Sequence, residues 1–122
     1  MMKLYDKKKA VAFILRRVYL EEYQTLSREL LEPLIGQCVD ADFDYMLACD
    51  IFRPDGSRGE CFYNKENARR HILFALIKGE KLTDRRFDDL YKLVDDYLDF
   101  NLSYLEYLGL SYPTGVNPEE RY

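Results

Sequence analysis

The sequence predicts an all-α fold, a compact bundle of four to five helices with a long C-terminal helix as its spine. Two patterns carry this prediction: apolar residues recur at helical spacing along most of the chain, and helix-capping residues separate the segments. The chain has 122 residues, 48% of them hydrophobic and 33% charged, a balance typical of one globular domain. We expect this domain to cover residues 1–113 and residues 114–122 to form a mobile tail.

The first helix is expected to run from about Asp6 to Tyr23. Asp6 suits the N-cap position because its carboxylate can accept hydrogen bonds from the free N–H groups of the first turn. The apolar residues that follow cover more than half of the helix circumference, so this helix should be buried on more than one side. Its main stripe consists of Val11, Ile14, Leu15 and Val18.

Two shorter helices are expected in the middle of the chain. One begins near Arg28 and should kink or break before Gly36, because the ring of Pro33 clashes with the preceding turn. The other covers residues 39–52, where three aspartates suit the positive end of a helix dipole. Apolar residues also alternate with these aspartates, so the alternative is an α+β fold with a short hairpin around residues 47–63.

The last two helices have clear boundaries in the sequence. Asn64 precedes a helix over residues 65–78, Thr83 precedes one over residues 84–108, and a glycine follows each. Four of the seven heptad columns of the last helix are apolar, which is more than a two-stranded coiled-coil seam requires. This helix should therefore contact at least two neighbours.

Four residues of the last helix are candidates for a self-association interface. Asn101 is the polar residue in an otherwise apolar heptad column, and a buried amide there can fix an oligomeric state. Tyr97, Tyr104 and Tyr107 suit a half-buried surface, since tyrosine joins a large apolar body to a polar tip. The alternative is that all four pack and form hydrogen bonds within one chain.

An acidic cluster on the same helix is the candidate metal site. Asp95, Asp96 and Asp99 have the spacing DDxxD, which resembles the aspartate-rich motif of helical prenyl-diphosphate enzymes. This resemblance implies Mg²⁺ bound by the three carboxylates and, through the ion, a diphosphate. The alternative is an ordinary solvated acidic face.

Charge, cysteine use and hydropathy limit the class of protein. Residues 1–20 carry six basic side chains and one acidic one, and residues 21–60 reverse this balance, as expected if neighbouring helices attract each other. No apolar run is long enough to span a bilayer. A cytoplasmic location is expected, and aspartates on the last helix oppose nucleic-acid binding. The cysteines should be buried reduced thiols, and the only histidine, His71, should lie on the buried side of its helix.

These observations favour a small, non-enzymatic protein-interaction or regulatory module that binds another protein or a second copy of itself. We identify no catalytic residue and expect no cofactor. One alternative is a metal-dependent enzyme acting on phosphorylated small molecules through helix-borne carboxylates, with Glu29 and Glu32 assisting the aspartate cluster. The other alternative is a nucleic-acid-binding module.

Overall fold

The computed structural model describes residues 5–109 apart from 56 and 58. This part of the chain is all-helical, which confirms the predicted fold class, and it contains four α-helices rather than five. The predicted tail, 114–122, and the last residues of the predicted domain lie outside the described residues. The helices are α1 (Lys7–Leu15), α2 (Arg28–Ala48), α3 (Lys65–Ile77) and α4 (Asp84–Tyr107), and η2 (Leu20–Glu22) is a short 3₁₀ turn.

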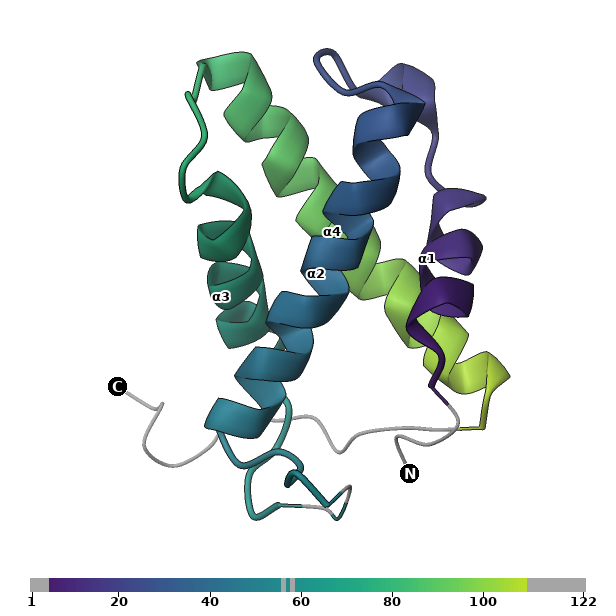
Figure 1. The fold of residues 1–122 in the computed structure, drawn as a ribbon, viewed down its shortest axis with the longest axis vertical. Coiled ribbons are helices and arrows are strands. Elements are labelled where there is room, and N and C mark those ends of the chain that lie inside the picture. Colours follow the sequence, from purple (N-terminus) through teal and green to yellow (C-terminus); the bar gives the residue numbers. More distant parts are fainter. Residues whose placement is uncertain (1–4, 56, 58, 110–122) are drawn as a thin grey trace.

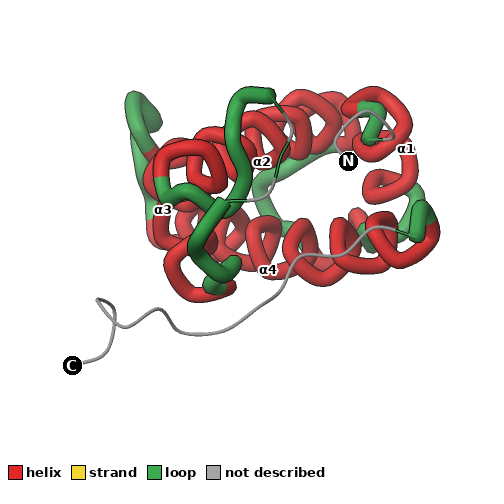
Figure 2. Tube along the Cα trace, turned by 90° about the horizontal axis from the view of Figure 1, so that it is seen from below, coloured by secondary structure: helices red, strands yellow, loops and turns green. Residues whose placement is uncertain are grey.

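The two long helices, α2 and α4, cross at the centre of the bundle, and α1 and α3 flank the crossing on opposite sides (Figure 1). Seen from below, α2 and α4 lie in two layers, with α3 near one end and α1 near the other (Figure 2). Both long helices contact both short ones. The central position is therefore shared by α2 and α4, and the prediction of a single C-terminal spine is not confirmed.

The first helix ends at Leu15, eight residues earlier than predicted. The chain after it is held by tertiary contacts that a helix would not allow. Tyr23 is buried, and its hydroxyl donates a 2.6 Å hydrogen bond to Asp96. The backbone N–H of Thr25 donates a 2.5 Å hydrogen bond to the buried carboxylate of Asp89. These contacts attach the 16–27 segment to α4 in a form that is not α-helical.

The structure also corrects the prediction for residues 28–52. The two short helices expected there are a single helix of 21 residues, α2. It begins at Arg28 as predicted and passes through Pro33 and Gly36 without a break. Pro33 is the sixth residue of the helix and is exposed. The helix therefore loses one backbone hydrogen bond near its N-terminus, where water can compensate. Asp40, Asp42 and Asp44 therefore lie in the interior of a helix, not at its N-terminus.

Residues 49–64 form a loop, and no strand occurs in the described part of it, so the alternative hairpin is not present. Phe52 and Tyr63 each form a single β-bridge that does not extend into a strand. Ile51 and Phe52 are buried beneath the bundle, which anchors the loop to the core.

The predicted starts of the last two helices are confirmed, and each helix ends one residue earlier than predicted, at Ile77 and Tyr107. Asn64 caps α3 by accepting a hydrogen bond from the N–H of Asn67, and Thr83 caps α4 by accepting one from Arg86. The glycines that follow these helices have φ of 82° and 72°, a left-handed conformation that favours glycine at helix C-termini. Among the described residues, no helix is both long and apolar enough to cross a membrane.

Candidate functional site

Each of the three predicted metal-binding aspartates is paired with a side chain from elsewhere in the chain. Asp95 lies 2.6 Å from the guanidinium of Arg69, and Asp99 lies 3.0 Å from the ammonium of Lys65. Asp96 accepts the hydrogen bond from Tyr23. No group of three or more potential metal ligands gathers in the described part of the chain. The geometry makes these carboxylates links between α4 and its neighbours.

The four predicted interface residues divide into a buried group and one exposed residue. Tyr97 has no exposed surface, and Asn101 and Tyr104 are 4% and 3% exposed. The carbonyl oxygen of the Asn101 side chain accepts a 2.6 Å hydrogen bond from the hydroxyl of Tyr5. Tyr107 is 76% exposed. Of the four, only Tyr107 is available at the surface of the described chain.

His71 and two of the three cysteines are more exposed than the sequence predicted. His71 is exposed on α3, with its ring centroid 6.0 Å from that of Tyr45. Cys38 is buried as expected, but Cys49 is exposed and Cys61 is partly exposed. Cys49 follows α2 at the point where the chain leaves the bundle, which explains its exposure.

A polar cluster lies within the core between α2 and α4. The carboxylate of Asp42, 1% exposed, accepts hydrogen bonds from the hydroxyls of Tyr97 at 2.7 Å and Tyr63 at 2.8 Å. Burial raises the pKa of Asp42 to about 6, because it outweighs the two hydrogen bonds, which favour the ionised form. Burial beside Asp42 also raises the pKa of Tyr97 well above its ordinary value.

A groove opens between α1 and the C-terminal end of α4, and we call it the α1–α4 groove. Its floor is apolar and aromatic. The rings of Phe13 and Tyr104 lie 5.2 Å apart, and those of Tyr104 and Tyr107 stack at 6.5 Å. The groove is lined by Asp6, Lys9, Ala12, Phe13, Arg16, Arg17, Tyr104, Tyr107 and Leu108.

The rim of the α1–α4 groove is basic, with three cations and one carboxylate. Lys9 and Arg16 are exposed, and neither forms an ion pair with another described residue. Arg17 stacks on Phe13, with its guanidinium carbon 3.4 Å from the ring centroid, and donates a hydrogen bond to the Phe13 carbonyl oxygen. Asp6 caps α1 by accepting a hydrogen bond from the N–H of Lys9. The groove therefore has unpaired positive charge beside aromatic surface.

Sequence reasoning missed this groove, although part of its signal was visible. The basic character of residues 1–20 is visible in the sequence, and in the structure Arg16 and Arg17 are both exposed. Their closeness to Tyr107, about ninety residues along the chain, comes from the contact between α1 and α4.

Comparison of the chain with protein-family models, curated proteins and solved structures found no match. The described part of the chain is a small four-helix bundle with a basic, aromatic surface groove.

Proposed function

We propose that this protein is a non-enzymatic interaction module whose α1–α4 groove binds an acidic segment of a partner protein. The observation that carries the proposal is the combination of cations without ion pairs and an exposed aromatic side chain, Tyr107, on one surface. Aromatic and arginine side chains are the residue types enriched at protein interfaces. The protein as a whole is acidic, with a net charge of −4, so the basic groove differs in sign from the rest of the chain.

Charge complementarity selects the class of partner. An acidic segment gains attraction from Lys9, Arg16 and Arg17 as it approaches, and this attraction raises the association rate. Apolar side chains of the segment would lie against the ring of Tyr107 and the methyl group of Ala12. Nucleic acid is a less suitable occupant because the acidic remainder of the surface repels a long polyanion.

The proposal is tested by fluorescence anisotropy with a short labelled peptide that contains glutamates and leucines. One comparison peptide has glutamines in place of the glutamates, and another has serines in place of the leucines. We expect the glutamate–leucine peptide to bind most tightly. The double variant Arg16→Glu, Arg17→Glu should weaken this binding by about tenfold or more, since two attractive charges become repulsive.

Arg70→Glu combined with Arg85→Glu is the matched control, because both arginines are exposed and lie outside the groove. This control should bind the peptide like the wild type. Equal weakening in both double variants would show only a general charge effect and would overturn the proposal. Tighter binding to single-stranded DNA than to the acidic peptide would also overturn it.

A second copy of the chain is the other protein occupant that the sequence suggested. Molar mass measured by light scattering, over a wide concentration range, distinguishes the two. We expect a monomer. A dimer that dissociates in the Arg16→Glu, Arg17→Glu variant would assign the groove to self-association and overturn binding of a separate partner.

A further inference from the structure

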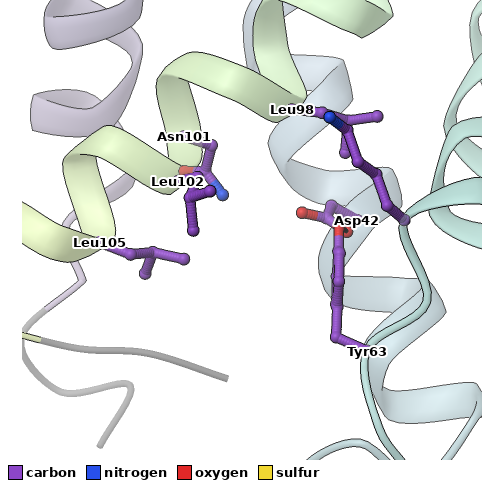
Figure 3. A pocket seen from close by; sticks show the side chains of 7 residues that line it. Asp42, Tyr63, Leu98, Asn101, Leu102 and Leu105 are labelled. Atoms are coloured by element: carbon purple, nitrogen blue, oxygen red, sulfur yellow. Dashed lines mark hydrogen bonds between the residues drawn. The ribbon is translucent and has the colours of Figure 1, made fainter. Parts of the chain in front are cut away.

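Two hollows lie beside the C-terminal half of α4, and they differ in what they offer an occupant. Figure 3 shows the first, between α2, α3 and α4, with Asp42 and Tyr63 side by side in its wall. Both oxygens of this carboxylate already accept hydrogen bonds, and every buried polar side-chain atom of the described residues has a partner. The second is the α1–α4 groove, where Lys9 and Arg16 form no ion pair with another described residue. Of the two, the groove has charge that an occupant can match.

The chain leaves α4 at the edge of this groove. Leu108 lines the groove, and Gly109 follows it as the last described residue. Figure 1 shows the C-terminal end of α4, in yellow, beside the start of α1. The sequence continues for thirteen residues, which we call the 110–122 segment. Whatever this segment contains is therefore attached next to the groove.

The 110–122 segment is long enough to cover the whole groove. An extended chain spans at most about 3.6 Å per residue, so Glu119, ten residues beyond Gly109, can lie up to about 36 Å from it. Lys9 and Arg17 are eight positions apart along α1, which corresponds to about 12 Å at a helical rise. Each cation of the groove is therefore within reach of this glutamate.

The composition of the 110–122 segment complements that of the groove. The segment has two acidic side chains, Glu119 and Glu120, and one basic side chain, Arg121, whereas the groove has three cations and one carboxylate. Residues 1–4, which also lie outside the described part of the chain, contain a lysine and no acidic residue, so they do not match the groove. The apolar and aromatic side chains that the segment offers to the aromatic floor are Leu110, Tyr112, Val116 and Tyr122.

We propose that the 110–122 segment binds the α1–α4 groove of its own chain and competes there with the partner. This inference rests on the proposed function and adds its regulation. The two glutamates approach Arg16 and Arg17, and an apolar side chain of the segment lies against the ring of Tyr107. A segment tethered beside its site acts at a millimolar effective concentration, so even a weak contact occupies the groove. A partner has to displace the segment, which lowers the apparent affinity of the partner.

The test uses the full chain with the two substitutions Glu119→Gln and Glu120→Gln. These remove the negative side-chain charge of the segment and change no described residue, so the bundle should fold as before. Two-dimensional ¹H–¹⁵N NMR should show shifts at the amides of Ala12 and Tyr107 relative to the wild type, because the groove loses its occupant. The labelled glutamate–leucine peptide should bind about fivefold more tightly to this variant than to the wild type.

Glu29→Gln combined with Glu32→Gln is the matched control, because both glutamates are exposed and lie outside the groove. This control should leave the groove amides and the peptide affinity unchanged. Equal shifts in the control and the segment variant, or no shifts in either, would refute the contact between segment and groove. Groove shifts that change with protein concentration in the wild type would also refute it, since they would assign the groove to the segment of a second copy.

The outcomes separate this inference from the proposed function. Equally tight binding of the peptide to the wild type and to the Glu119→Gln, Glu120→Gln variant would keep the groove as a partner site and overturn regulation by the segment. Shifts of the groove amides in this variant, without peptide binding to either protein, would support the segment as occupant of the groove and overturn the binding of a separate partner.

Discussion

The hydroxyl of Tyr97 donates a 2.7 Å hydrogen bond to the carboxylate of Asp42, and both side chains are buried where α4 crosses α2. The two residues are 55 positions apart in the chain. Because the carboxylate has little access to water, each of its tyrosine partners replaces part of a lost hydration shell.

The first prediction follows from this contact. Tyr97→Phe removes one donor from a buried carboxylate and should lower the free energy of unfolding by about 1–3 kcal/mol. Tyr63→Phe should cost less because Tyr63 is partly exposed and water can replace its hydroxyl. Urea unfolding followed by circular dichroism measures both. Tyr107→Phe serves as the control on an exposed tyrosine, and a Tyr97→Phe variant as stable as this control would contradict the prediction.

The raised pKa of Asp42 predicts a specific pH dependence of stability. Its pKa rises from 3.8 in the unfolded chain to about 6 in the folded one, so the folded state binds this proton more tightly. The tighter binding of this proton by Asp42 therefore stabilises the folded state fully below about pH 4. This stabilisation is lost as the pH rises through about 6. A shift of this size corresponds to at most about 3 kcal/mol.

The measurement compares the free energy of unfolding of the wild type and Asp42→Asn at several pH values. Only the difference between them is informative, because carboxylates with lowered pKa values, such as Asp89, act in the opposite direction. As the pH rises from 4 to 6, the free energy of unfolding of the wild type should fall relative to that of Asp42→Asn. The other ionisable groups near Asp42 are Cys38, Tyr63, Lys65 and Tyr97. Parallel profiles for the two proteins would show that Asp42 does not titrate in this range.

Asp89 is predicted to hold the 16–27 segment onto α4. Burial alone would raise its pKa, but hydrogen bonds from Thr25 and Gln24 outweigh burial and lower it. Asp89→Ala should therefore destabilise the fold by about 2 kcal/mol or more. Hydrogen exchange at the amides of Gln24 and Thr25 should accelerate. Asp88→Ala, at the exposed neighbouring position, should leave exchange there unchanged; equal effects of the two substitutions would disprove this role.

Gly59 is predicted to be required where the loop passes Asp50. A Cβ atom at Gly59 would lie 2.0 Å from the backbone oxygen of Asp50, so the loop would have to move. Gly59→Ala should cost more than about 2 kcal/mol. Gly79→Ala is an instructive comparison, since no atom lies within 4 Å of its Cβ position and only its φ of 82° is unfavourable. It should cost about 1 kcal/mol. Thermal unfolding of both variants measures the difference, and a smaller loss for Gly59→Ala would contradict the clash.

Cap residues and apolar spacing are local properties, so the sequence by itself determined the all-α class and most helix starts. Asp6, Asn64 and Thr83 were each predicted as N-caps, and each accepts a hydrogen bond from the first turn of its helix. Such a contact involves residues three positions apart and needs no tertiary structure.

Only the tertiary structure decided where the first helix ends, whether Pro33 interrupts α2 and which polar residues are buried. Asp42 looks like a solvated residue in an alternating stretch, yet tyrosines from a distant loop and helix surround it. The end of α1 depends likewise on Asp89, which lies on α4 more than sixty residues beyond the segment it holds. Desolvation and pairing of this kind depend on which segments meet in space, and local sequence patterns do not record that.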